Sequence, residues 1–358
     1  MKKQLEKPFE YLKRKDGSGF STDIIKNWYE ARAYVLDKLK NTAFPPGSKS
    51  HLHVVVTTDT PLMLSAIRQV ALTAHYPNFE ETTGKNRSLI TLVSQNPQII
   101  EELSKEEYLG NLPTVCKYTL YHAAPVNPDS YIDIELQIVD QWPDGESQEF
   151  IKMSEDEVKA FLQTRNEEDI YCIDTHKAVL ANRIYSLGTL IDNLPAEDIN
   201  NTKRYMLALD VFQKKYLRKQ ITPLIDTAKW KSDPILVKNG LSNIFCTDCF
   251  MLRAAFCKEE NNEALSISEH ARWVVDKLIM GFRPMNHQER ITDERLFGEM
   301  KKRQYRNQLK KNPSDPVHID ICSYSDLRRI DPDSLKYDSF LMLAIPTILS
   351  KTGISTPI

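Results

Sequence analysis

Short runs of β-branched and aliphatic residues alternate with amphipathic segments along much of the chain. Runs of this kind are typical of strands buried in a parallel sheet. They predict strands at 52–58, 88–94, 131–139, 170–174 and 234–238. Helices are predicted between them over 61–75 and 97–103, the first opened by a Thr60 cap followed by proline. The alternation predicts an α/β fold built on a doubly wound parallel sheet.

The hydrophobic pattern changes near residue 245, after which strand signals disappear. A chain of 358 residues is long enough for two domains, since one core rarely grows past about 250–300 residues. We predict an N-terminal helical arm over 1–46 with its helix at 22–39, an α/β domain over 47–245, and a small, mainly helical domain over 246–358. The helical domain carries a long polar insertion over 286–316.

The first helix of that domain shows clear start and stop signals. Ser266 with Glu269 three residues later predicts a capping box at its beginning. Gly281 suits the position just past its end. At about 100° per residue, one apolar stripe predicts the core face. Its members are Ile267, Ala271, Val274, Leu278 and Gly281.

A second stripe on the same helix holds His270, Trp273 and Lys277, and these residues are expected at the edge of the core, where a cleft would lie. Arg272 and Asp276 are predicted to lie away from both stripes. An aromatic plane between an imidazole and an ammonium group suits a nucleotide ligand. A tryptophan packed on a neighbouring helix is the alternative interpretation.

Composition and charge describe a soluble globular protein, with 41% hydrophobic and 27% charged residues. The net charge of −2 gives no global attraction to nucleic acid or membranes. The basic run over 301–311 is interpreted as the solvated face of a helix, so nucleic acid is not expected as a partner. No apolar run reaches the ~18 residues that span a bilayer, and no signal peptide is predicted. We expect a cytoplasmic protein without direct membrane insertion.

The six cysteines are scattered and do not predict a disulfide scaffold. Cys246 and Cys249 form one CxxC pair, but a structural zinc site needs two further ligands, which Cys257 alone does not supply. We therefore predict reduced thiols, no metal and no bound cofactor.

The turn after the first strand bears on nucleotide binding in the α/β domain. A Rossmann-type site needs glycines there, so that the backbone can approach a pyrophosphate. Residues 57–61 contain no glycine, and Asp59 would place a negative charge beside the phosphates. We predict a degenerate Rossmann-like domain that does not bind NAD in the usual pose. No nucleophile elbow, P-loop or HExxH motif predicts catalysis.

Three segments of the C-terminal region resemble the ryanodine-receptor-type (RyR) domain family in order and spacing. They are EHARW at 269–273 with KLIMGFRP at 277–284, HIDICSYSDL at 318–327, and YD at 337–338. Phe282, Ile319 and Ser339 depart from the family, which has tryptophan, proline and often arginine there. Upstream, the chain is similar to bacterial proteins that join a TrkA-N-like Rossmann domain to a C-terminal RyR domain, through its strand–helix–strand unit, LPAED at 194–198 and NN at 200–201.

The resemblance implies a sensor of nucleotides or nucleotide-derived messengers in bacterial antiviral or stress signalling. Aromatic members of the set would stack a purine, and Lys277, Arg283 and His318 would meet phosphates. The expected ligand-binding residues are His270, Trp273, Lys277, Phe282, Arg283, His318, Asp320, Tyr324, Tyr337 and Asp338. The expected partners are a small-molecule nucleotide, further copies of the chain in a homo-oligomer, and an effector or membrane protein.

Three functions remain open from the sequence. The leading hypothesis is a non-enzymatic nucleotide sensor. The alternatives are an NAD- or nucleotide-processing enzyme with an atypical site, and a structural oligomerising subunit. The missing phosphate glycines favour the sensor over the enzyme, and the stripe of aromatic and basic residues favours it over the structural subunit.

Overall fold

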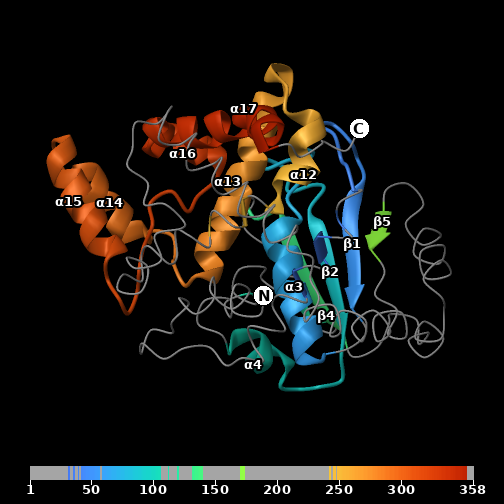
Figure 1. Ribbon diagram of the computed structural model, residues 1–358. Coiled ribbons are helices and arrows are strands. Elements are labelled where there is room, and N and C mark those ends of the chain that lie inside the picture. Colours follow the sequence, from blue (N-terminus) through green and yellow to red (C-terminus); the bar gives the residue numbers. More distant parts are fainter. Residues whose placement is uncertain are drawn as a thin grey trace, which may run out of the picture.

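The computed structural model describes residues 42–56, 59–105, 131–139, 170–173 and 248–352, with scattered positions at 31–39, 112, 119–120 and 242–246 (Figure 1). The predicted strand at 234–238 and most of the predicted helix at 22–39 lie outside these residues. In the part that is described, no helix combines the length and the apolar character needed to cross a membrane.

Five parallel strands form one sheet, in the order β3-β4-β2-β1-β5. The strands are β1 (His51–Val56), β2 (Ser88–Val93), β3 (Thr119–Leu120), β4 (Ile134–Val139) and β5 (Ile170–Ile173). From β1 the strand order runs through β2 and β4 to β3 at one edge. The chain then returns to the opposite side of β1 to form β5. Four predicted strands are confirmed, whereas β3 is too short to leave a periodic signal in the sequence.

Two helices connect the strands as predicted. The first, α3 (Pro61–Thr73), begins at Thr60, whose side-chain oxygen accepts a hydrogen bond from the backbone N–H of Met63 at 3.4 Å. Proline suits the first helical position because its missing N–H would have no partner there. The second, α4 (Ile99–Ser104), begins two residues later than predicted.

The C-terminal region is mainly helical, as the loss of strand signals predicts. Its α-helices are α12 (Phe250–Arg253), α13 (Asn262–Ile279), α14 (His287–Arg295), α15 (Glu299–Lys310), α16 (Tyr324–Ile330) and α17 (Leu335–Thr352). Short 3-10 turns lie at η1 (Ala254–Phe256), η2 (Glu259–Asn261) and η3 (Pro332–Ser334). Helix α13 packs against both α3 and α17.

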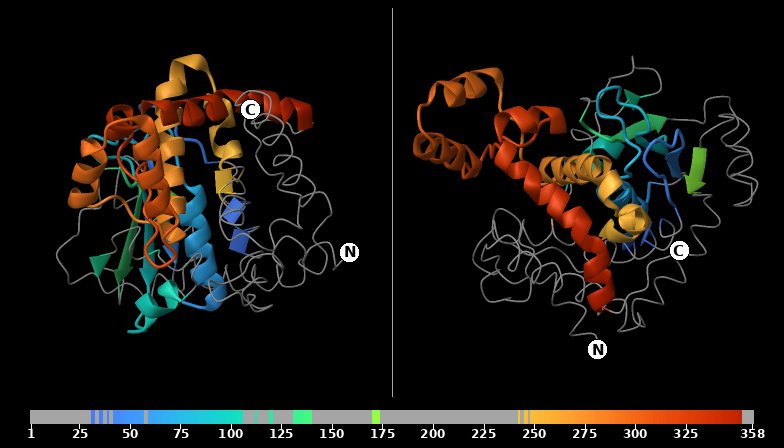
Figure 2. Two further views of the ribbon diagram at one scale, coloured as in Figure 1. Left: turned by 90° about the vertical axis from the view of Figure 1, so that its left-hand side faces the viewer. Right: turned by 90° about the horizontal axis from the view of Figure 1, so that it is seen from above.

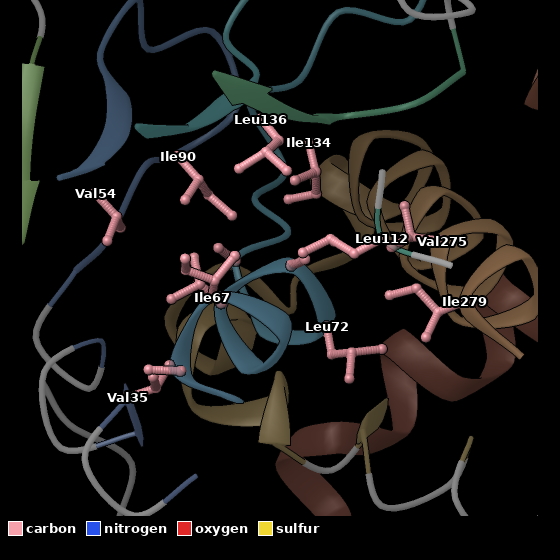
Figure 3. Close-up of a cluster of buried hydrophobic side chains, with 14 of the residues drawn as sticks. Val35, Val54, Ile67, Leu72, Ile90, Leu112, Ile134, Leu136, Val275 and Ile279 are labelled. Atoms are coloured by element: carbon pink, nitrogen blue, oxygen red, sulfur yellow. The ribbon is translucent and has the colours of Figure 1, made fainter. Parts of the chain in front are cut away.

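One continuous hydrophobic core joins the sheet to the helical region. Figure 3 shows Ile90 and Leu136 of the sheet facing α3, with Val275 and Ile279 of α13 at another side of that helix. All four side chains are buried. Helix α13 thus supports the sheet as well as its own region. The boundary near 245 stays a prediction, and the core does not break there.

The predicted polar insertion forms a hairpin of two helices, α14 and α15, that projects from the body of the molecule (Figures 1 and 2). The two ends of the hairpin meet at a β-bridge between Arg283 and Val317. The residues on either side of this bridge, Phe282 and His318, belong to the predicted ligand site.

Candidate functional site

Helix α13 begins four residues earlier than Ser266, at Asn262. The predicted capping box is therefore wrong, because Ser266 and Glu269 lie inside the helix and are buried. The end of the helix is confirmed. Gly281 has φ 86, and the backbone N–H groups of Gly281 and Phe282 donate to the carbonyls of Leu278 and Lys277 at 2.9 and 3.0 Å. This reversal, which favours glycine, directs the chain back along the helix.

Charged residues of α13 that were expected away from the core are buried in it. Glu269 accepts hydrogen bonds from Arg253 and from Arg272, the latter at 2.7 Å through Nη2. Burial alone would raise the pKa of Glu269, but the charges and hydrogen bonds of Arg272 and Arg253 lower it to about 2. Arg272 and Asp276 lie off both predicted stripes and are nevertheless buried. Helical periodicity cannot reveal charges that a distant arginine neutralises inside a core.

His270 bridges two segments that follow it in the chain. Its Nε2 lies 2.9 Å from the carbonyl oxygen of Cys322, and its Nδ1 lies 3.4 Å from Oδ2 of Asp338 on α17. Burial disfavours the charged ring, but the Asp338 carboxylate and, after it, the Cys322 side chain raise the pKa of His270 to about 10. His270 is therefore an imidazolium that donates from both nitrogens. Burial raises the pKa of Asp338, and the charge of His270 opposes that rise.

Three further aromatic rings gather around Trp273 and His270. The Trp273 ring lies nearly parallel to that of His270, at 6.1 Å between centroids, and meets His318 edge-on at 4.8 Å. Phe282 lies 6.1 Å from His318, and Tyr324 lies 5.7 Å from His270. Trp273 is only partly buried. The structure thus brings together predicted site residues from two separate segments, 269–284 and 318–327.

Lys277 lies in the same cluster but is deeply buried. Its Nζ is 5.6 Å from the centroid of the Trp273 ring and 3.6 Å from Oδ2 of Asp276. Burial lowers the pKa of Lys277, and the charge of Asp276 opposes that effect. Neither carboxylate oxygen of Asp276 has a hydrogen-bond partner among the described residues. Lys277 and Asp276 therefore form a buried charge pair held by proximity.

His318 and Asp320 differ from His270 and Asp338 in their charge state. The Nδ1 atom of His318 accepts the backbone N–H of Asp320 at 3.3 Å, and burial, aided by nearby Lys310 and Lys277, lowers the pKa of His318 well below its usual value. The ring is neutral, so its 3.7 Å approach to the Asp320 carboxylate is not an ion pair. Burial raises the pKa of Asp320 to about 6. Its Oδ1 is buried and has no hydrogen-bond partner within the described chain.

Two predicted site residues point elsewhere. Arg283 directs its guanidinium to the base of the hairpin, where it donates to Glu289 at 2.8 Å and to Asp315 at 2.7 Å. Its role as a phosphate ligand is therefore not supported by this geometry. Tyr337 is half-buried on α17, with the Lys336 ammonium group 5.6 Å from its ring centroid. Consecutive helical residues point about 100° apart, so Tyr337 and Asp338 face different directions.

A long-range contact that the sequence did not predict holds Tyr324 in place. The carboxylate of Glu81, in the turn after α3, accepts hydrogen bonds from the backbone N–H groups of Tyr324 and Ser325 at the start of α16. Ser323 caps the same helix by accepting from the N–H of Asp326 at 3.0 Å. The Ser-x-x-Asp spacing could have predicted the cap. No local pattern points to Glu81.

The CxxC thiols are buried, and Asp59 after the first strand is hydrogen-bonded. Cys249 is buried, its thiol donates to the carbonyl of Thr73 at 3.3 Å, and burial raises its pKa to about 12. Cys246 is also a buried free thiol. Within the described ranges, no cluster of three or more His, Cys, Asp or Glu residues could hold a metal ion. Asp59 accepts from the Ser94 hydroxyl at 2.7 Å.

Comparisons with known proteins give no relative for this chain: no family model, curated protein or solved structure matches it.

Proposed function

We propose that this protein is a non-enzymatic sensor of a nucleotide or a nucleotide-derived messenger, with the binding site centred on Trp273. One observation carries the proposal. Residues from two segments far apart in the sequence converge on one half-buried tryptophan, and they include an imidazolium and an ammonium group.

The chemistry of the cluster suits a planar, anionic ligand. The partly exposed indole can stack a nucleobase, which is worth ~1–3 kcal/mol per base in single-strand binders. His270 and Lys277 supply positive charge close to the ring. The buried, unpartnered Oδ1 of Asp320 can accept a donor such as an exocyclic amine. Each of these groups is positioned by the fold before any ligand arrives.

The arrangement of the elements supports a degenerate Rossmann-like sheet followed by a RyR-like region. The order β4-β2-β1-β5 reverses direction at β1, as in doubly wound sheets. In the helical region, the three segments that resemble RyR domains lie on α13, before and within α16, and on α17. The acidic Asp59 at the end of β1 supports the proposal that the ligand binds at Trp273 instead of at the sheet.

For the enzyme alternative, Cys322, His270 and Asp338 would be candidates for a nucleophile, a base and an orienting acid. The geometry does not favour it. Cys322 is buried, and burial raises the pKa of its thiol. The imidazole nitrogen on that side faces the Cys322 carbonyl oxygen. A thiol that is buried and protonated does not act as a nucleophile, so the sensor is the better supported function.

A thermal-shift screen against mono-, di- and cyclic nucleotides, NAD and ADP-ribose tests the proposal, followed by calorimetry with the best ligand. The test variant is Asp276→Asn with Lys277→Met, which removes one negative and one positive charge and so keeps the net charge of the buried cluster, while Arg272, 3.7 Å from Asp276 in the wild type, keeps its hydrogen bonds to Glu269. We expect the double variant to fold and to bind tenfold to a hundredfold more weakly, since one charge-assisted contact is worth ~1.5–3 kcal/mol.

The matched control is Lys258→Met, because Lys258 is exposed and lies outside the cluster. It is expected to bind like the wild type. Wild-type affinity in the Asp276→Asn, Lys277→Met protein would place the ligand elsewhere, and conversion of the ligand into product would favour the enzyme.

A further inference from the structure

Two large apolar side chains are exposed at the far end of the projecting hairpin, one in the loop between α14 and α15 and one in the first turn of α15. Phe297 is 89% exposed and Met300 is 75% exposed. Among the described residues, Leu343 on α17, at 38%, is the one other large apolar side chain classed as exposed. Single exposed apolar residues are common on protein surfaces, but two neighbouring ones on a projection indicate a contact surface.

The hairpin is also the basic part of an acidic molecule. Residues 286–311 contain eight basic and four acidic residues, a net charge of +4, whereas the whole chain carries −2. Exposed basic side chains flank the two apolar ones at Arg295, Lys301 and Arg303, and the exposed carboxylates Glu294 and Glu299 offset only part of their charge. Electrostatic attraction therefore favours contact between this tip and an anionic surface. The rest of the chain, which is net acidic, would be repelled by the same surface.

The hairpin is held rigidly enough to present its tip. Arg306 of α15 donates to both carboxylate oxygens of Asp293 on α14, each at 2.8 Å. At the opposite end, Arg283 joins Glu289 to Asp315. Asn286 and Glu289 form a reciprocal capping box at the start of α14. Two ion-paired ends fix the direction in which the tip points.

We propose that the hairpin tip docks on an anionic lipid surface, with Phe297 and Met300 inserted among the headgroups and the flanking basic residues paired with lipid phosphates and carboxylates. The tip is a narrow projection, which fits a surface that yields around it. Its apolar side chains are far too few for the roughly 800 Å² per partner of a stable dimer. This is adsorption by side chains at the interface and spans no bilayer.

Co-sedimentation of the full chain with vesicles tests the proposal. The two compositions are phosphatidylcholine alone and equimolar phosphatidylcholine and phosphatidylserine. We expect binding to the anionic vesicles that weakens with added salt, and at least tenfold weaker binding to the neutral ones. Phe297→Ser with Met300→Ser should reduce binding to anionic vesicles about tenfold or more, as should Lys301→Gln with Arg303→Gln.

Matched controls lie elsewhere on the surface. Leu343→Ser removes an exposed apolar side chain from α17, and Lys258→Gln removes an exposed charge, and both should bind like the wild type. Unchanged thermal unfolding of the tip variants shows that they fold. The proposal fails if the wild type ignores both vesicles or binds both equally. It also fails if the tip substitutions leave vesicle binding unchanged, even where they abolish self-association or nucleic-acid binding.

Discussion

His270 illustrates how a single buried side chain acquires an unusual charge state. Both of its nitrogens face acceptors, the Cys322 carbonyl and the Asp338 carboxylate. A histidine whose pKa is higher in the folded protein than in the unfolded chain binds its proton more tightly when folded. Its stabilisation is complete below about pH 6.5 and is lost as the pH rises through about 10.

Replacing Asp338 with asparagine tests this charge state. We expect the wild type to lose unfolding free energy between about pH 6.5 and 10, and Asp338→Asn to flatten that decline by an amount on the order of a few kcal/mol. Urea unfolding at intervals of pH measures the effect. The control Asp333→Asn changes an exposed carboxylate in η3 and should keep the wild-type profile. A flat wild-type profile would mean that His270 is neutral.

At the scale of single elements, α16 is placed by a residue of another region. Glu81 stabilises its first turn both by accepting two backbone N–H groups and by its negative charge at the positive end of the helix. Because this turn also carries Tyr324, which contacts His270, the segment after α3 influences the candidate site from outside the C-terminal region.

Glu81→Gln is expected to lower the unfolding free energy by about 1–2 kcal/mol, because the amide keeps one acceptor and loses the charge. Hydrogen exchange should accelerate at the amides of Tyr324 and Ser325, because only one acceptor remains for the two N–H groups. Glu80→Gln is the matched control, since Glu80 is exposed and accepts from the Thr83 hydroxyl. Equal exchange in both variants would show that Glu81 does not hold the helix.

The strands and α3 could be predicted closely because each carries its own local signal. The β-branched runs give β1 and β2 within one or two residues, and Thr60 with Pro61 marks the start of α3. The beginning of α13 could not be predicted, since Ser266 and Glu269 match a capping box by sequence while tertiary contacts bury both. Burial of Arg272 depends on Glu269, which Arg253 shares from another helix, and no periodicity encodes such a partnership.

Some residues of the candidate site could likewise be predicted from the sequence, and others could not. Spacing on one helix correctly grouped His270, Trp273 and Lys277, and the resemblance to RyR domains added Phe282, His318 and Tyr324, which the structure brings to the same cluster. The partners of Arg283 and Glu81 could not be predicted, because they are set by the hairpin and by the turn after α3. Long-range ion pairs leave no trace in a single sequence.

At the scale of the whole molecule, the shared core makes the sheet and the C-terminal helices depend on each other. Ile279 of α13 is fully buried among residues that include the strand side chains Ile90 and Leu136. A cavity at this position would remove contacts from both regions at once.

Ile279→Ala is therefore expected to lower the unfolding free energy by about 2–5 kcal/mol and to reduce hydrogen-exchange protection in β2 and in α17 together. The control is Leu309→Ala, at a half-buried position of α15 in the hairpin. It should lower the unfolding free energy by less and leave hydrogen-exchange protection in β2 unchanged. Loss of protection confined to α17 would show that the helical region unfolds as an independent unit.

The β-bridge between Arg283 and Val317 has a consequence for how this chain can vary. Because the two ends of the α14–α15 hairpin meet at this bridge, the hairpin can gain or lose turns of helix without moving the residues that precede and follow it. The entropy cost of closing a loop changes only slowly with its length, so such changes have a small effect on stability. Phe282 and His318 would keep their separation while the tip moved nearer to the body or farther from it. The distance at which this protein makes contact with its surroundings is thus adjustable by insertion and deletion alone, independently of the cluster around Trp273.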